Sequence, residues 1–156
     1  MSHIDLTRTP GFHVLVAEDD ADDRLLFQEA CEEIDPALSL RFARDGVELL
    51  ELLEAGGRTN PSLLVLDINM PRMTGKEVLL ALRCDPDRRT IPTVVMSTSI
   101  LQADIDSAYE LGANGFVAKP TRFRDLVRDV EVMLDYWRGC VRLPSGSGDA
   151  PPDPTR

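Results

Sequence analysis

A short apolar run leads straight into five carboxylates within residues 16–23, whose sequence is VAEDDADD. Like charges this close repel one another, so the cluster is costly unless something positive neutralises it. A metal ion is one candidate, because Mg²⁺ prefers oxygen ligands and keeps several of its waters. The other candidate is water together with the positive end of a following helix. The stretch therefore indicates either a metal site or a solvated helix start.

Other residues that could do chemistry follow the later apolar runs of the chain. They are Asp67 after SLLVL, Ser97, Thr98 and Ser99 at the end of PTVVMSTS, and Lys119 with Pro120 after GFVA. If these runs are parallel strands, their carboxyl ends meet at one edge of the sheet, where open α/β sheets bind ligands. Acids, hydroxyls and one lysine would then share one crevice, which is a far more specific signal than any of them alone.

Strand-length apolar runs alternate with helical patterns, and we predict strands at residues 12–17, 38–43, 62–66, 91–97 and 115–119. One helix face is indicated by the i, i+3, i+4, i+7 spacing of Phe27, Ala30, Cys31 and Ile34. Further helices are expected at residues 45–56, 76–85, 105–112 and, most clearly, 123–137. This alternation with short connections predicts an α/β fold, a doubly wound five-stranded parallel sheet with helices on both faces.

Composition and charge narrow the classes of function. A formal net charge of −10 without a basic patch argues against a nucleic-acid partner. No run approaches the roughly 18 apolar residues of a membrane span, and the three cysteines lie outside any CxxC motif, so we expect a cytoplasmic protein with no membrane partner. We divide the chain into an N-terminal extension (1–11), one domain (12–137) and a Pro/Gly/Ser-rich, partly disordered C-terminal extension (138–156).

The motifs at the predicted strand ends carry a resemblance to a known family. They are AEDD, LDINMPRMTG, MSTS and VAKPT, and Ser97 and Lys119 lie 30 and 52 positions after Asp67. Over about residues 12–137 the chain resembles the receiver domain of two-component response regulators, including the single-domain chemotaxis regulator. The resemblance implies a flavodoxin-like (βα)5 fold. It also implies a signalling protein that accepts a phosphoryl group from a sensor histidine kinase and catalyses only its own phosphorylation and dephosphorylation.

The resemblance gives each residue of the crevice a role. Asp67 matches the phosphoacceptor, and Lys119 matches the lysine that pairs with a phosphoryl oxygen. Asp19, Asp67 and the backbone carbonyl of Asn69 would bind Mg²⁺, while Glu18 would hold ligand waters. These residue types suit phosphoryl transfer, which needs charge neutralisation and positioning more than covalent help. A metal site is therefore the favoured explanation of the acidic stretch.

Five further positions take expectations from the same resemblance. Ser97 matches the hydroxyl that binds a phosphoryl oxygen and moves on activation, and Thr98 replaces a smaller residue that is common beside it. Phe116 matches an aromatic residue that swings inward on activation, although a plain core aromatic would look the same in the sequence. Ser99 stands at a position that tunes the lifetime of the acyl phosphate. Family members usually have a cis peptide bond before the proline matched by Pro120.

The remaining acids of the stretch have simpler interpretations. Asp20 suits either the N-cap of the first helix, because an aspartate there accepts a hydrogen bond from a free amide of the first turn, or a place as a peripheral water partner of the site. Asp22 and Asp23 fall in that first turn, where carboxylates interact favourably with the helix dipole. We therefore expect only Glu18 and Asp19 of this stretch to belong to the site.

The segment DYWRGCVRLP resembles the C-terminal extension of small regulators partnered with cyanobacterial phytochromes and bacteriophytochromes. That resemblance implies a bacteriophytochrome-type kinase as partner and a homodimer through the fourth and fifth helices. Tyr136 and Trp137 offer a large amphipathic contact of the kind found at interface centres. The alternative for Trp137 is that it simply closes the core at the end of the helix.

Two other functions remain open. A phosphatase of the haloacid-dehalogenase type also uses an aspartate after a strand, Mg²⁺ and a lysine. It needs an acid two residues beyond the nucleophile, where this chain has Asn69. A receiver fold kept only as a phosphorylation-independent adaptor is the second alternative. It predicts that a site residue should be missing, and none is missing here.

Overall fold

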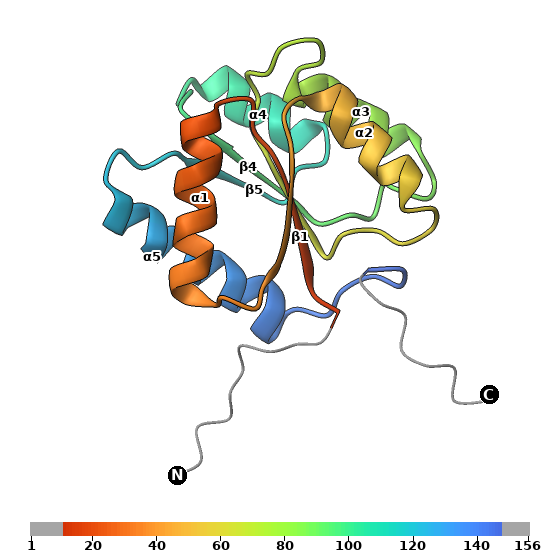
Figure 1. Cartoon of the computed structure of the whole chain (residues 1–156). Coiled ribbons are helices and arrows are strands. Elements are labelled where there is room, and N and C mark those ends of the chain that lie inside the picture. The colour runs from red at the N-terminus through yellow and green to blue at the C-terminus, as the bar shows by residue number, and fades with distance from the viewer. Residues whose placement is uncertain (1–10, 148–156) are drawn as a thin grey trace, which may run out of the picture.

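Residues 11–147 are described by a computed structural model in which five strands alternate with five α-helices (Figure 1). The strands are β1 (His13–Ala17), β2 (Ser39–Ala43), β3 (Leu63–Leu66), β4 (Thr93–Ser97) and β5 (Gly115–Ala118). The helices are α1 (Ala21–Ile34), α2 (Gly46–Ala55), α3 (Gly75–Cys84), α4 (Gln102–Glu110) and α5 (Phe123–Leu134), followed by a π-helical turn η1 (Asp135–Cys140). Every predicted strand and helix is present, and each strand is one or two residues shorter than predicted.

The five strands form one parallel sheet in the order β2-β1-β3-β4-β5. Strand β1 is second in the sheet, and the direction of winding reverses between β1 and β3, which is the point where such sheets bind ligands. Helices α1 and α5 cover one face of the sheet and α2, α3 and α4 cover the other (Figure 1). The predicted doubly wound α/β fold is confirmed.

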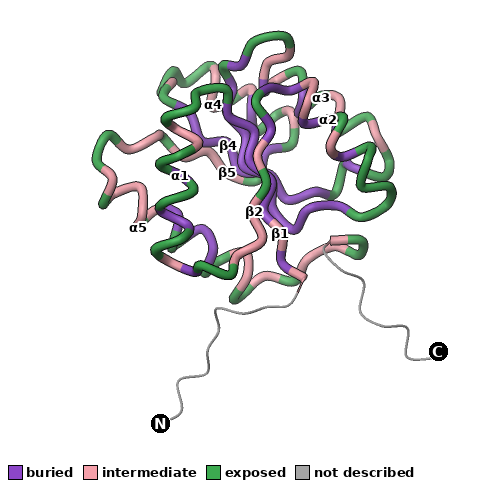
Figure 2. The backbone as a smooth tube through the Cα atoms, in the orientation of Figure 1, coloured by how far each residue is buried: buried purple, intermediate pink, exposed green. Residues whose placement is uncertain are grey.

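Successive residues of a strand pack into two separate hydrophobic cores, one on each face of the sheet. Val14 and Val16 pack with Phe27 under α1 and α5, whereas Leu15 and Ala17 pack on the side of α2, α3 and α4. Strand β3 is buried on both faces over its whole length, and the buried strands form the centre of the molecule (Figure 2). Because side chains within the strands are committed to these cores, polar groups can gather only where the strands end.

The last helix differs from its prediction. The sequence indicates one continuous helix to residue 137, but the α-helix ends at Leu134 and a π-helical turn continues to Cys140. Arg138 in this turn pairs with Asp35 at the end of α1 over 2.9 Å, in a nearly buried position. Hydrophobic periodicity does not reveal this change, because the α-helical turn and the π-helical turn follow the same apolar pattern in the sequence.

Part of the predicted C-terminal extension packs on the domain. Leu143 lies against the core under α1 and α5, and the amide of Asn60 donates to the carbonyl of Gly146 over 2.8 Å. Residues 1–10 and 148–156 lie outside the described residues, so the three-part division of the chain stays a prediction. None of the helices in residues 11–147 has the length and apolar character to cross a membrane.

Candidate functional site

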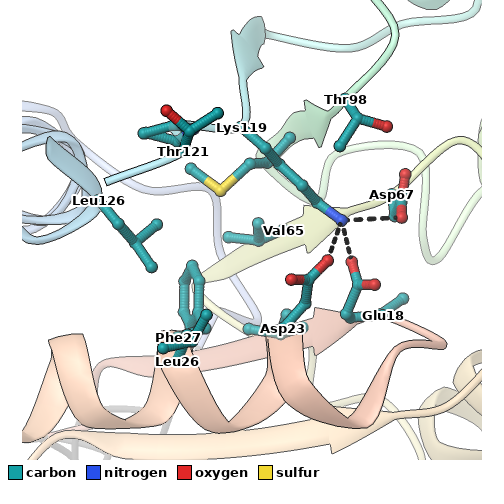
Figure 3. A pocket seen from close by; sticks show the side chains of 14 residues that line it. Glu18, Asp23, Leu26, Phe27, Val65, Asp67, Thr98, Lys119, Thr121 and Leu126 are labelled. Carbon is teal, nitrogen blue, oxygen red and sulfur yellow. Dashed lines mark hydrogen bonds and ion pairs between the residues drawn. The ribbon is translucent and has the colours of Figure 1, made fainter. Parts of the chain in front are cut away.

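Residues just beyond the strand ends converge at the carboxyl edge of the sheet. The amide of Asp67 donates to the carbonyl of Ala17 over 3.0 Å, and the amide of Lys119 donates to the carbonyl of Ser97 over 2.9 Å. These bonds extend the parallel ladder by one residue, so the side chains of Asp67 and Lys119 start from fixed backbone. Together with Glu18 they line one pocket (Figure 3).

Lys119 lies among three carboxylates. Its Nζ atom is 2.7 Å from Glu18 Oε2, 3.0 Å from Asp67 Oδ2 and 3.1 Å from Asp23 Oδ2, and Figure 3 marks all three contacts. The lysine side chain is only 15% exposed. An ammonium group has three hydrogen-bond donors, so these acceptors use its full capacity. One ammonium group is therefore shared by three carboxyl groups.

The acidic cluster has the composition of a divalent cation site. Carboxylate oxygens of Glu18, Asp19 and Asp67 can all lie within 4.8 Å of one another. Three hard oxygen donors with an excess of negative charge fit Mg²⁺. The amide of Asn69 donates to Asp67 Oδ1 over 3.2 Å, which keeps its backbone beside the cluster. The carbonyl of Asn69 as a ligand stays a prediction.

Burial and neighbouring charges shift the pKa values of Glu18 and Lys119. Burial raises the pKa of Glu18 from an ordinary 4.5 to about 7, and the charge of Asp67 acts in the same direction against the hydrogen bond from Lys119. Burial alone would lower the pKa of Lys119, but its hydrogen bond to Glu18 and the charge of Asp67 outweigh burial and raise that pKa. Lys119 therefore stays protonated at neutral pH, whereas Glu18 gains or loses its proton near neutral pH.

A glycine lets the β3–α3 loop hold the backbone of Asp67. The amide of Gly75 donates to the carbonyl of Ile68 over 2.8 Å. A Cβ atom at residue 75 would lie 2.3 Å from the carbonyl oxygen of Asp67, so only glycine permits this approach. Although Gly75 closes the motif LDINMPRMTG, the sequence gives no sign that it touches the aspartate.

An arginine that the sequence analysis does not single out fixes the acidic β1–α1 loop. Arg24 Nη1 donates to the carbonyls of Glu18 and Asp19, each over 2.9 Å. The amide of Asp20 donates to Glu18 Oε1 over 3.1 Å. These bonds hold the loop in a shape that keeps the side chains of Glu18 and Asp19 near Asp67. An arginine in a first helical turn beside acids suggests only an ordinary salt bridge.

The two predicted hydroxyl residues lie differently. Ser97 is fully buried at the end of β4, and its Oγ accepts from the amide of Ser99 over 3.2 Å. Thr98 is exposed and lines the pocket with Asp67 and Lys119 (Figure 3). Phe116 is half-buried in β5 and packs against the core on the side of α2, α3 and α4. The catalytic and switching roles of these residues stay predictions.

A polar network ties the loop after β4 to two helices. Ser99 Oγ donates to Asp104 Oδ2 over 2.6 Å, and Lys76 Nζ in α3 lies 2.6 Å from Asp104 Oδ1. These two hydrogen bonds lower the pKa of Asp104, with Lys76 as the larger cause. The network therefore restrains the segment that carries Ser97 and Thr98.

The predictions for Asp20, Asp22 and Asp23 have different outcomes. Asp20 is the N-cap of α1, as predicted, and its Oδ1 accepts from the amide of Asp23 over 2.9 Å. Asp22 is exposed in the first turn. Asp23 as a first-turn acid alone was an incomplete interpretation, because its side chain contacts Lys119.

The prediction of a cis peptide bond before Pro120 is wrong, since residues 11–147 contain no cis peptide bond. Trans is the commoner isomer even before proline.

Comparison with protein families and curated proteins gives consistent matches. Residues 14–131 match the family described as response regulator receiver domain. The chain is 35% identical over 136 residues to a probable methanogenesis regulatory protein, FilR2, from Methanothrix harundinacea, covering 85% of this chain and 88% of that protein. It is 32% identical over 136 residues to response regulator Rcp1 from a Synechocystis species, covering 85% and 92%.

Solved structures show the same likeness in three dimensions. The phosphorylated cyanobacterial phytochrome response regulator RcpA is 31% identical and superposes with a TM-score of 0.80, covering 88% of this chain and all of that one. The Mn²⁺-bound form of Rcp1 is 32% identical, with a TM-score of 0.77 over 87% of this chain and all of that one. Both likenesses extend over nearly the whole described part of the chain.

Proposed function

This chain belongs to the response regulator receiver domain family, and we propose that it signals by accepting a phosphoryl group on Asp67 from a histidine kinase. The observation that carries the proposal is the position of Asp67. One of its carboxylate oxygens lies 3.0 Å from the ammonium of Lys119, and its carboxylate adjoins those of Glu18 and Asp19. A nucleophilic carboxylate beside one fixed cation and an oxygen-donor metal site is what phosphoryl transfer requires.

In the proposed reaction an oxygen of Asp67 forms a bond to phosphorus as the bond from phosphorus to the kinase histidine nitrogen breaks. The bonding electrons leave with the imidazole, and an acyl phosphate remains on Asp67. Lys119 holds its charge through the reaction, because its raised pKa keeps it protonated. The amide of Asn69 holds the carboxylate of Asp67, and the amide of Gly75 holds the next carbonyl along the chain, that of Ile68.

Mg²⁺ is the proposed cofactor, held by Asp19, Asp67 and the carbonyl of Asn69, with Glu18 beside it. The support is the oxygen-donor cluster of this chain and the Mn²⁺-bound form of its relative Rcp1. When bound, the ion supplies positive charge opposite the developing phosphoryl charge. The acidic stretch after β1 needs such a cation, because Lys119 alone leaves the cluster negative.

The proposed chemistry is tested by intact mass after incubation with acetyl phosphate and Mg²⁺. We expect one added phosphoryl group on the wild type, none on Asp67→Asn, and none when EDTA removes the metal. Beryllofluoride binding, followed by fluorine NMR, separates rapid turnover from an inert site. An adaptor that only keeps the fold would show neither an adduct nor beryllofluoride binding, and that result would overturn the proposal.

We propose a phytochrome-type sensor histidine kinase in the cytoplasm as the upstream partner. The similarity to RcpA, a cyanobacterial phytochrome response regulator, supports this choice. The similarity to FilR2, whose name concerns methanogenesis, shows that comparable identity also occurs with regulators of another process. Phosphotransfer from purified phosphorylated kinases of both classes tests the choice, and faster transfer from the other class would contradict it.

We also propose a homodimer through α4 and α5, with Tyr136 and Trp137 of the following turn η1 in the contact. Tyr109, Val132 and Tyr136 are 51%, 63% and 52% exposed on this hollowed surface. Trp137 is half-buried against the core and meets Tyr136 edge-to-face at 5.2 Å, so it supports the contact from beneath. Exposed aromatic and aliphatic side chains grouped in this way are typical of interfaces.

Sedimentation at tens of micromolar tests the dimer, and we expect Tyr136→Glu to shift it to monomer. Leu80→Glu is the matched control, because Leu80 is 52% exposed on α3 outside this surface. A wild type that sediments as a monomer with and without beryllofluoride would contradict the proposed dimer and leave the phosphorylation site untouched.

A further inference from the structure

Asp23 occupies an unusual place for an acid at a helix start. It is the third residue of α1, whose N-cap is Asp20. A carboxylate at this position commonly turns back to the amide of the N-cap residue. Here Oδ2 of Asp23 instead lies 3.1 Å from Lys119 Nζ, across a separation of 96 positions. Figure 3 shows the side chain directed into the pocket toward the lysine.

Asp23 is also unlike the other two partners of Lys119. Glu18 and Asp67 belong to the acidic cluster with metal-site spacing, and Asp23 does not. The Asp23 side chain is 41% exposed, whereas the other two are 7% and 8% exposed. Its contact with the ammonium is the longest of the three. It is therefore the partner that most readily gives way.

A phosphoryl group on Asp67 makes two demands that Asp23 opposes. The group needs a donor from Lys119, all of whose donors are already used. It also adds negative charge to a site where four carboxylates already face one lysine, with the proposed Mg²⁺ as the only further positive charge. Removing the charge of Asp23 eases both conflicts at once, since it weakens the hold on one donor of Lys119 and lowers the surplus charge.

We propose that Asp23 is a positioning residue that draws Lys119 toward α1 and thereby weakens the binding of a phosphoryl group at Asp67. The inference rests on the proposed function, because it concerns the same site. In the unphosphorylated protein Asp23 keeps the lysine engaged, and on phosphorylation the lysine exchanges this contact for a phosphoryl oxygen. The acid thus sets how strongly the site favours its unphosphorylated form.

The test compares beryllofluoride affinity, in saturating Mg²⁺, between wild type and Asp23→Asn by fluorine NMR. We expect the variant to bind about five- to twentyfold more tightly, a range discounted for the exposure of Asp23. Asp22→Asn is the matched control, because it removes the same charge from the same helical turn at an exposed position. Its affinity should stay within about twofold of the wild type.

Two further measurements separate positioning from a general structural role. Asp23→Glu retains the charge and should return the affinity to the wild-type range. In a Lys119→Gln background, Asp23→Asn should tighten binding by a smaller factor than in the wild type, because the competing contact is already absent and only the surplus charge is relieved. Urea unfolding in EDTA checks that Asp22→Asn and Asp23→Asn both stay folded under the conditions of the binding measurement, so that a difference in affinity does not reflect loss of the fold.

The outcomes distinguish this inference from the function on which it rests. If the wild type binds no beryllofluoride and accepts no phosphoryl group, both fail. If the wild type binds but Asp23→Asn binds equally or more weakly, only the role of Asp23 is overturned. Equal tightening by Asp22→Asn would also overturn it, since the effect would then belong to the charge of the helix start.

Discussion

The half-buried cation of Lys119 and the buried cation of Arg88 lie at opposite edges of the sheet, and their hydrogen-bond acceptors differ. At the carboxyl edge, Lys119 is shared by three carboxylates. At the amino edge, the guanidinium of Arg88 donates to Asn60 Oδ1 and to the carbonyls of Leu53 and Gly57, over 2.6, 2.7 and 2.6 Å. These partners are neutral oxygens, and within residues 11–147 no carboxylate forms a salt bridge with Arg88.

The difference separates a fixed cation from an exchangeable one. Arg88 presents a rigid planar fork, and its carbonyl partners lie at the C-terminal end of α2, where the helix dipole favours a positive charge. None of these three acceptors can change its charge. The carboxylate partners of Lys119 can take up protons, and under the proposed function they also bind a metal or accept a phosphoryl group. We therefore expect Arg88 to stabilise the fold under all conditions and Lys119 to do so conditionally.

The largest effect is expected for Arg88→Met. The free energy of unfolding should fall by about 3–4 kcal/mol, because buried acceptors lose hydrogen bonds from a charged donor. The loss should be the same in EDTA and in Mg²⁺, and beryllofluoride binding by the folded variant should be unchanged. Urea denaturation measures the loss, with the exposed Arg89→Met as control. A loss that Mg²⁺ reverses would remove the distinction between the two cations.

A smaller and conditional effect is expected for Lys119→Met. In EDTA the variant should lose about 2 kcal/mol of unfolding free energy, because Glu18 and Asp67 keep their burial without a counter-charge. Saturating Mg²⁺ should restore most of this stability, since the ion replaces the missing charge. Lys76→Met, which breaks the ion pair with Asp104 outside the pocket, should gain no comparable rescue. Equal losses with and without Mg²⁺ would show that Lys119 is as structural as Arg88.

Much of the carboxyl edge could be predicted from the sequence. Parallel strands bring the residues that follow them to one edge of the sheet, whichever way the side chains of those residues point. Asp67 and Lys119 were identified in this way, and backbone hydrogen bonds to the neighbouring strands confirm their placement. The acids Glu18 and Asp19 follow β1 by the same logic, and their carboxylates cluster with that of Asp67.

The residues that the sequence missed act through side-chain direction or through close backbone approach. Asp23 and Lys119 are 96 positions apart. No local sequence pattern shows that the Asp23 side chain points toward the lysine. Gly75 matters because of one distance to a backbone oxygen, and Arg24 because it reaches two carbonyls. Arg88 looks like one more charge in a loop, although it is almost fully buried.

The smallest effect is a dependence of stability on pH that belongs only to the carboxyl edge. Glu18 has a folded-state pKa of about 7 against an ordinary 4.5, so between these values the folded protein binds more protons than the unfolded chain. In EDTA the free energy of unfolding should therefore decrease, by about 1–2 kcal/mol, as pH rises from about 5 to 8. Urea denaturation across this range measures the slope, and Glu18→Gln should flatten it.

The sign of this slope identifies its source. Asp45 and Asp104 have lowered pKa values, so their contributions are complete above about pH 4 and are lost only when the solution becomes more acidic. They cannot produce a decrease toward neutral pH. Mg²⁺ should abolish the slope, because a bound cation favours the charged form of Glu18 at every pH in the window. A slope that persists in Mg²⁺, or in Glu18→Gln, would place the titrating group outside the acidic cluster. The surplus charge around Lys119 would then not be what distinguishes this edge from the one held by Arg88.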